Sequence, residues 1–443
     1  MTARAGWADV EITPPLRLPM GGRGPRFAPG TTILDPLMAQ VLILEDAGGN
    51  RCLWVSLDLI GLDYGRSAAL RQNLAGLTGT PYEAVVFNFA HVHSGPMTNF
   101  RRYPDVMPEP PELREYHHTL AQAIRSAAEM ALANLQPVTV TRHTGASDVG
   151  INRRRRNAEG EIVMAPNPDG FYNRELWVLN ICRSVGGDRA VAFSYGCHPV
   201  IVYGFAWDSI SSDYPGATRQ ALRSHLGSAT HCQFLQGLAG NIRPRVLADP
   251  ETGTFRKSTP GDVDEVAARL AGDVLQALGE PSALLELTLK AAAGWIHPRR
   301  ALDLVPAIAH WQDMAAREDE LSRNIGKYWA ERTHSGAPLS THVPMEIGLL
   351  QIAVDQRVAW FGTEAVAEWL PALRKWLNDP SLTAWGYCQE VGTYLPTDAL
   401  LPEGGYEVTQ APWTDVHGPA PFAAGIDATV ETGFRKLAGQ MSS

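Results

Sequence analysis

The chain has 443 residues, 45% of them hydrophobic, which is enough to bury a sizeable core in one large domain or two ordinary ones. Acidic residues outnumber basic ones, 47 to 38, so the formal net charge is −9 and a nucleic-acid partner is not expected. The sequence has no apolar run as long as a signal peptide or a membrane helix, so we expect a cytoplasmic protein without stable membrane insertion.

Strand-like and helix-like patterns alternate along the chain. Apolar stretches with alternation or β-branched residues predict strands at 37–45, 51–60, 84–91, 137–143, 176–182, 190–196 and 231–236. Segments with helical periodicity predict helices at about 66–77, 112–134, 215–227, 262–278, 301–330, 364–378 and 421–439. The alternation excludes an all-β sandwich and an all-α bundle, and it predicts an α/β fold with helices layered over sheets.

Three stretches rich in Pro, Gly or polar residues, 13–36, 144–175 and 402–420, are too long to be simple turns. Long irregular loops in compact domains often carry function, so these segments are candidates for a site. The polar segment 246–262 is interpreted as a surface loop and not as a linker. We therefore expect residues 1–443 to form a single domain.

Two histidines follow the apolar strand in VVFNFAHVHSGP, residues 85–96. In an extended segment residues i and i+2 point to the same side, so His91 and His93 are expected to face one point beyond the sheet edge. This spacing suits metal binding. The alternative, in which both imidazoles hydrogen-bond to loop carbonyls, stays open at this point.

Two further strands also end in polar loops. AVAFSYGCHP, residues 190–199, ends at His198, and FLQGLAGNIRPR, residues 234–245, contains glycines that permit close backbone approach. Between them lies DSISSDYPG, residues 208–216, in which Ser212 or Asp213 is a candidate N-cap for the next helix.

The order of these motifs along the chain resembles the neutral (non-lysosomal) ceramidase family. The similar pieces are GWADVEITPP near the N-terminus, HVHSGP, INRR at 151–154, GCHP, SSDYPG, QGLAGNIRP, Glu364 and GTYLPT at 392–397. The resemblance covers essentially the whole chain as the catalytic domain of that family. It implies a ceramidase-like α/β domain of mixed sheets flanked by helices, without the family's C-terminal immunoglobulin-like domain.

The family binds zinc through two His, one Glu and one Tyr. Carried over by motif, the resemblance implies His91, His198, Glu364 and Tyr394 as the zinc ligands. For Glu364, an acidic residue at a helix N-terminus is the alternative, since the segment after it has a helical pattern. For Tyr394, simple core packing is the alternative.

Other family positions imply catalytic and binding roles. His93 is left beside the metal, where it is expected to move a proton, and Asp213 is a second candidate for proton transfer. Arg153 matches an Arg that binds the substrate or stabilises an oxyanion. Arg154, Arg155 and Arg156 are expected to form a solvated basic loop.

One departure from the family bears on the substrate. Where ceramidases have an Asp and a catalytic Ser in the loop AGNIRPR, this chain has Asn241 and Arg243. The absent serine argues against ceramide as the substrate. Asn241 and Arg243 become candidate substrate-binding residues, because an Arg in that place suits a carboxylate or another anionic group.

We therefore expect a zinc-dependent hydrolase that cleaves an amide bond of a small polar or anionic molecule. An ester, lactone or glycosidic bond is the alternative within hydrolases, because zinc and His do not select the leaving group. A binding protein that keeps a remnant zinc site is the alternative outside enzymes. The oligomeric state, including a homo-oligomer, is left open.

Overall fold

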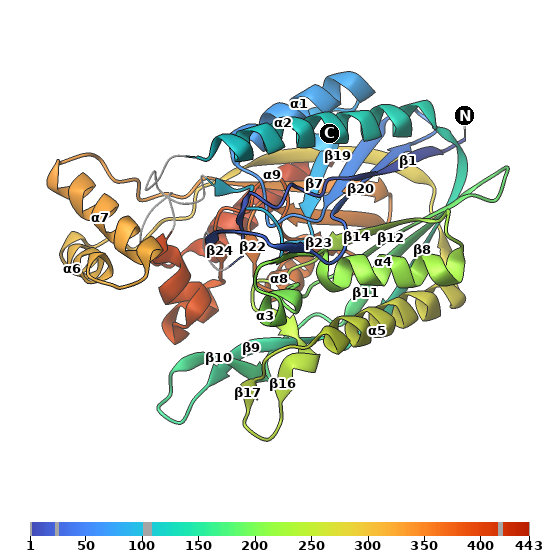
Figure 1. Cartoon of the computed structure of the whole chain (residues 1–443). Coiled ribbons are helices and arrows are strands. Elements are labelled where there is room, and N and C mark those ends of the chain that lie inside the picture. The colour runs from blue at the N-terminus through green and yellow to red at the C-terminus, as the bar shows by residue number, and fades with distance from the viewer. Residues whose placement is uncertain (1, 23–25, 101–108, 415–419, 443) are drawn as a thin grey trace.

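Apolar segments of the first two thirds of the chain build one large mixed sheet (Figure 1). Within the residues that the computed structural model describes (2–22, 26–100, 109–414 and 420–442), this sheet has nine strands in the order β14-β12-β11-β8-β1-β5-β6-β7, with β18 beside β8. The strands are β1 (Arg4–Glu11), β5 (Met38–Glu45), β6 (Arg51–Leu57), β7 (Val85–Phe89), β8 (Gln136–Ala146), β11 (Glu175–Arg183), β12 (Arg189–Tyr195), β14 (His231–Gln236) and β18 (Ala283–Leu284). Most neighbours are antiparallel, whereas β6 with β7 and β12 with β14 are parallel.

A second sheet packs against one face of the first. It contains β19 (Leu287–Ile296), β20 (Met345–Ala353), β21 (Gln356–Phe361) and β23 (Thr383–Trp385). Side chains of both sheets share one apolar core, in which Trp54 and Trp177 of the large sheet meet Leu350 and Trp360 of the small one. Strands with apolar residues on both faces are expected where each face of a sheet is covered.

Helices cover the outer faces of the two sheets. On the large sheet lie α1 (Tyr64–Thr78), α2 (Pro111–Ala133), α4 (Asp213–Leu226) and α5 (Pro260–Gly279), whereas α8 (Trp369–Trp376) and α9 (Ile426–Ser442) cover the small sheet. The resulting order of layers is helices, large sheet, small sheet and helices. The predicted α/β class with layered mixed sheets flanked by helices is confirmed. None of the described helices combines the length and apolar character needed to cross a bilayer.

The segment expected as one helix at 301–330 is a hairpin of two helices. They are α6 (Leu304–Ala315) and α7 (Glu320–His334), which extend away from the sheets in Figure 1. The chain turns because Asp319 caps α7, its carboxylate accepting a hydrogen bond from the backbone N–H of Ser322. Trp311 and Trp329 pack together in a small apolar core inside the hairpin.

The stretch 144–175 was expected to be irregular, and that expectation was wrong. It contains β9 (Gly150–Arg156) and β10 (Ile162–Asn167), which pair with β15 (Ile242–Pro244) in a separate small sheet. The strand β9 lacks apolar alternation, and its two buried arginines, Arg153 and Arg154, both pair with the distant carboxylate of Glu407. The stretch 246–262 contains only a short 3₁₀ turn, η3 (Arg245–Leu247), and the pair β16 (Ala248–Asp249) and β17 (Thr254–Phe255) before α5 begins.

The remaining described elements are short. The strand pairs are β2 (Pro19–Met20) with β3 (Arg26–Pro29), β4 (Thr32–Ile33) with β13 (Ser209–Ile210), and β22 (Glu364–Ala365) with β24 (Tyr394–Leu395). The short helical turns are η1 (Tyr82–Ala84), α3 (Val202–Phe205), η4 (Asp398–Glu403), η5 (Tyr406–Gln410) and η6 (Ala411–Thr414). The last three lie in the expected loop 402–420 or directly before it; residues 23–25 and 415–419 of the expected loops lie outside the described residues.

Candidate active site

Chain segments that leave the sheets at one edge bring the predicted ligands together. His91 follows β7, His198 follows β12, and Glu364 follows β21. Because β7 and β12 each have a parallel neighbour, the loops after them leave at the carboxyl ends of paired strands, where open α/β sheets commonly bind ligands.

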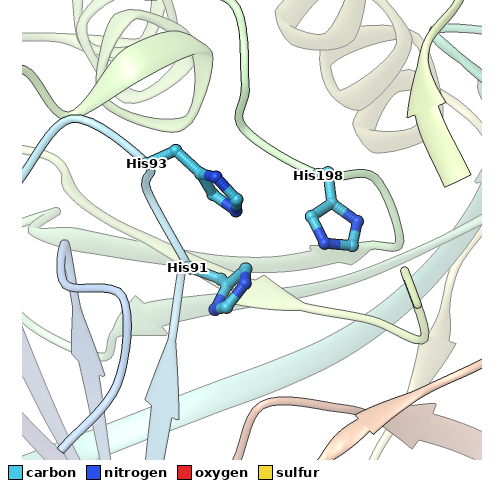
Figure 2. A group of neighbouring side chains, drawn as sticks. All are labelled: His91, His93 and His198. Atoms are coloured by element: carbon cyan, nitrogen blue, oxygen red, sulfur yellow. The ribbon is translucent and has the colours of Figure 1, made fainter. Parts of the chain in front are cut away.

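Three imidazole rings face one another at this edge (Figure 2). The ring centroids lie 5.0 Å apart for His91 and His93, 5.3 Å for His91 and His198, and 5.7 Å for His93 and His198. The sequence analysis predicted that strand alternation brings His91 and His93 together. That prediction was wrong, because His91 lies beyond the end of β7 with a φ of 65°. The loop conformation, and not strand alternation, places His91 beside His93.

Backbone carbonyls fix the tautomers of two of these histidines. Nδ1 of His91 lies 2.6 Å from the carbonyl oxygen of Ile60, and Nδ1 of His198 lies 2.6 Å from that of Ala239. A carbonyl can only accept a hydrogen bond, so each Nδ1 carries a hydrogen, and in the neutral imidazole Nε2 then presents a lone pair. Burial, with the nearby charge of Arg153, lowers the pKa of His198 to about 4, so this imidazole is neutral at pH 7.

Both lone pairs point at a carboxylate. Nε2 of His91 and Nε2 of His198 each lie 3.3 Å from Oε2 of Glu364, and all three side chains are buried. Lone pairs facing a carboxylate oxygen repel one another unless a cation lies between them. Imidazole nitrogen and carboxylate oxygen are ordinary zinc ligands, and a tetrahedral site with bonds of about 2.0–2.1 Å has ligand atoms about 3.3–3.4 Å apart. The donor set therefore fits a zinc ion.

Glu364 is held in a strand and not at a helix N-terminus. It lies in β22, opposite Tyr394 of β24, and its N–H donates to the carbonyl of Thr393. The predicted helix at 364–378 was wrong at its start, since α8 begins only at Trp369. The helix-dipole interpretation of Glu364 is thereby excluded.

Tyr394 lies at the edge of this group. Its ring stacks on that of His198 at 6.5 Å, and its hydroxyl accepts a hydrogen bond of 3.2 Å from Nη2 of Arg153. Burial and the carboxylate of Glu364 raise the pKa of the Tyr394 phenol. These contacts place the residue beside the group, and its role as a zinc ligand stays a prediction.

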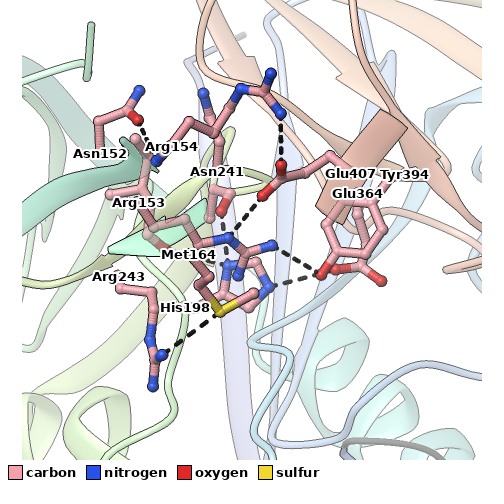
Figure 3. A network of polar contacts seen from close by, with 12 residues as sticks. Asn152, Arg153, Arg154, Met164, His198, Asn241, Arg243, Glu364, Tyr394 and Glu407 are labelled. Atoms are coloured by element: carbon pink, nitrogen blue, oxygen red, sulfur yellow. Dashed lines mark hydrogen bonds and ion pairs between the residues drawn. The ribbon is translucent and has the colours of Figure 1, made fainter. Parts of the chain in front are cut away.

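A buried ion network orients Arg153 (Figure 3). The Nε of Arg153 donates to Oε1 of Glu407, and Nη1 of Arg154 donates to Oε2 of the same carboxylate, each at 2.8 Å. Burial alone would raise the pKa of Glu407, but the two guanidinium groups outweigh burial and hold that pKa below its usual value. Arg153 is thus fixed in place by a neutralising carboxylate.

The expected solvated basic loop at Arg154, Arg155 and Arg156 is wrong as a loop, since all three residues lie in β9, and the expected exposure holds for two of them. Arg155 and Arg156 are exposed, whereas Arg154 is buried. Arg154 is buried because it also donates to the carboxylate of Glu403 and to the carbonyl of Gly404.

Asn241 was predicted to bind substrate, but the structure directs its side chain into the protein. Its Nδ2 donates to both carboxylate oxygens of Glu368, at 2.9 and 2.8 Å, and its Oδ1 accepts from the N–H of Ala367. Its carbonyl also accepts from the N–H of Arg153. Asn241 therefore links the segment after Glu364 to the strand of Arg153, and an Asp there would meet the carboxylate of Glu368.

Asp213 was predicted to move protons, but its carboxylate accepts hydrogen bonds from backbone N–H groups. Its Oδ2 accepts hydrogen bonds of 2.9 Å from the N–H groups of Ile201 and Val202, and its Oδ1 accepts one of 2.6 Å from Tyr214. Burial raises the pKa of Asp213 to about 6. By holding the turn after His198, Asp213 positions the loop that carries His198.

A cavity of about 590 Å³ opens onto the group formed by His91, His93 and Glu364. Predicted site residues that line it are His91, His93, Arg153, Arg243, Glu364 and Tyr394, together with Gly22, Met164, Val200, Tyr203, Tyr406, Ala411, Thr414, and Arg317, Asp319, Leu321 and Ser322 of the α6–α7 hairpin. Asn241 and Asp213 are not among the described lining residues.

Arg243 occupies the cavity wall. Its guanidinium contacts the sulfur of Met164 at 3.7 Å and lies over the ring of Phe255, 4.7 Å from the centroid. Both contacts are made by the guanidinium group, which therefore lies at the cavity wall; the role of Arg243 in substrate binding stays a prediction.

Three tyrosines and one helix hairpin at the site were not predicted from the sequence. Tyr387 lies with its hydroxyl 3.4 Å from Nε2 of His198, and Tyr203 and Tyr406 line the cavity. The α6–α7 hairpin was missed as a cavity wall. None of these carries a spacing or composition signal, because each reaches the site from a separate part of the chain.

Comparisons with known proteins support the fold. The chain is similar over 99% of its length to the crystal structure of neutral ceramidase from Pseudomonas aeruginosa, with a TM-score of 0.71, 16% identity and 74% of that chain covered. It is equally similar to a ceramidase complexed with C2, with a TM-score of 0.71, 15% identity and 75% of that chain covered. No protein-family model matches the chain. No curated protein matches it in sequence. The chain therefore has a neutral-ceramidase-like fold.

Proposed function

We propose that the protein is a zinc-dependent hydrolase that cleaves an amide bond of a small polar or anionic substrate. The observation that carries this proposal is the convergence of Nε2 of His91 and Nε2 of His198 on Oε2 of Glu364, each at 3.3 Å. Both Nδ1 hydrogens are already committed to carbonyls, so a divalent cation is the group that satisfies this arrangement.

His91, His198 and Glu364 would hold the zinc ion, and the family resemblance adds Tyr394. When bound, zinc lowers the pKa of a water ligand toward neutrality and polarises the scissile carbonyl. The carbonyls of Ile60 and Ala239 support this by fixing the orientation of the two imidazoles, as second-shell acceptors do in other zinc sites.

His93 is proposed as the residue that moves the proton. It lines the cavity, and its ring lies 5.0 Å from that of His91 and 5.7 Å from that of His198. Gly22 packs against His93 with a φ of 121°, and a Cβ there would lie 3.1 Å from the carbonyl oxygen of His93. From this position His93 takes a proton from the attacking water and delivers it to the leaving nitrogen.

Arg153 is proposed to stabilise the negative charge that develops on the carbonyl oxygen of the substrate. The buried carboxylate of Glu407 holds the guanidinium at the cavity wall beside Tyr394. Donors that are fixed before the reaction need no reorganisation as charge develops. Arg243, on the same cavity, is proposed to bind an anionic group elsewhere on the substrate.

The test is metal analysis of the purified protein followed by a hydrolysis screen with amides, esters, lactones and glycosides, each with and without a carboxylate. We expect about one zinc per chain and turnover of carboxylate-bearing amides that a chelator abolishes and zinc restores. Bound zinc without turnover of any substrate class would support a remnant binding site and refute the hydrolase. Turnover of another class alone would refute the amide assignment.

A further inference from the structure

A tyrosine that neither the motifs nor the family resemblance assigns lies against the proposed ligands. Tyr387 follows β23 and is fully buried. Its hydroxyl lies 3.4 Å from Nε2 of His198, and its ring centroid lies 4.5 Å from that of His91.

The backbone of Tyr387 also joins the segments that carry the other ligands. Its N–H donates to the carbonyl of Thr363, the residue before Glu364, at 3.0 Å, and its carbonyl accepts from the N–H of Phe89, at the end of β7, at 2.9 Å. Its φ is 56°, which a bulky residue rarely adopts. Such strain persists where the surrounding structure requires it, most often at functional sites.

The lone pair on His198 limits what the hydroxyl of Tyr387 can do. With Nδ1 protonated, Nε2 has one lone pair, which lies near both Oε2 of Glu364 and the hydroxyl of Tyr387, and of these two groups only the hydroxyl can donate a hydrogen bond to it. A metal bound to Nε2 takes this lone pair, so that hydrogen bond cannot coexist with the ion. The distance of 3.4 Å from Nε2 to the hydroxyl equals the spacing of about 3.3–3.4 Å between ligand atoms around zinc.

Resting on the metal site of the proposed function, we infer that Tyr387 supplies an oxygen ligand to the ion held by His91, His198 and Glu364. The phenol oxygen offers a lone pair to the ion, so no bond of Tyr387 has to break. The position of Tyr394 differs from that of Tyr387, because Tyr394 lines the cavity and its hydroxyl accepts a hydrogen bond from Arg153. Tyr387 is not among the described cavity-lining residues, so it contacts the ion from the protein interior.

The experiment compares zinc and cobalt binding by the full-length metal-free protein and its variants. Zinc affinity is measured by competition with a chromogenic chelator, and the cobalt site by its visible absorption. We expect Tyr387→Phe to weaken zinc binding at least 10–100-fold, the range typical for partners of metal ligands, and to change the cobalt spectrum. Tyr116→Phe is the matched control, because Tyr116 is a buried tyrosine whose hydroxyl donates to the carbonyl of Ile12.

A second variant separates ligand loss from misfolding. Tyr387→His offers a nitrogen donor, and His tolerates a positive φ better than most residues, so it should recover affinity relative to Tyr387→Phe. If Tyr387→Phe keeps wild-type affinity and spectrum, or if Tyr387→His binds no better than an equally stable Tyr387→Phe, Tyr387 is not a ligand. If the wild-type protein binds neither metal, the proposed metal site itself fails.

Discussion

Replacing Glu407 by Gln is expected to lower the free energy of unfolding more than removing the charge of any neighbouring residue. The substitution keeps the size of the side chain but exchanges a carboxylate oxygen for an NH₂ group that would face a guanidinium donor. Arg153 and Arg154 then lose their shared counter-ion while remaining buried, with side chains 5% and 4% exposed. Breaking a buried ion pair from one side costs about 3–5 kcal/mol. Because Tyr394 still accepts from Arg153, we expect about 3 kcal/mol.

Glu403 provides a matched control. It also pairs with Arg154, but its side chain is 35% exposed, so Glu403→Gln should cost at most about 1 kcal/mol. The free energy of unfolding is measured by urea denaturation of the wild-type protein and both variants at pH 7. Equal midpoints for Glu407→Gln and Glu403→Gln would refute the stabilising role of the buried network.

The same pair of variants gives a pH test. The pKa of Glu407 is lowered in the folded protein, so its stabilising contribution is complete above the unfolded-state pKa of about 4.3 and is lost as the pH falls through the lower folded-state value. The difference in stability between wild type and Glu407→Gln should therefore shrink below pH 4. A difference that grows with acid would contradict the assigned ion pairs.

The remaining predictions concern the site. His91→Ala and His198→Ala should each lose zinc, as measured by elemental analysis of the purified variants. Stoichiometric zinc in both variants would refute the ligand assignment. His93→Ala should keep zinc but lose activity about 10²–10⁴-fold, since it removes only the proton carrier; loss of zinc in this variant would instead make His93 a ligand. Arg243→Lys should raise KM for an anionic substrate with unchanged zinc content and melting temperature, because Lys cannot bind a carboxylate through two donors. Wild-type kinetics in this variant would remove Arg243 from substrate recognition.

The strands that position the site could be predicted because their signals are local. The runs before His91 and His198 are apolar and each ends at a polar loop containing Pro; β12 lies within one residue of the predicted 190–196, whereas β7 ends at Phe89, two residues before the predicted end at His91. The left-handed backbone of His91 has no such signal. Its N–H donates to the carbonyl of Leu59, and this contact with a neighbouring loop fixes a conformation that alternation alone would not indicate.

Residues whose partners are distant in sequence were harder to predict. Glu364 has a helix-like segment after it, but pairing with Tyr394, thirty positions along the chain, places it in a strand, because tertiary contacts override local propensity. The side chain of Asn241 donates to the carboxylate of Glu368, and the carboxylate of Asp213 accepts hydrogen bonds from backbone N–H groups. Motif position identified the right loops for these residues, but only the fold shows which way each side chain points.

The α6–α7 hairpin shows the same limit at a larger scale. Its sequence predicts helix correctly, and the break before Asp319 has an N-cap that could have been recognised. That Arg317 and Asp319 line the cavity depends on where the hairpin folds back, which no local pattern encodes.

The central claim is that His91, His198 and Glu364 hold one zinc ion. Anomalous X-ray diffraction from crystals of the purified protein, recorded on both sides of the zinc absorption edge, tests it directly. We expect one strong anomalous peak per chain within bonding distance of Nε2 of His91, Nε2 of His198 and Oε2 of Glu364. A zinc peak bound by other residues, or no peak from protein soaked in zinc, would contradict it.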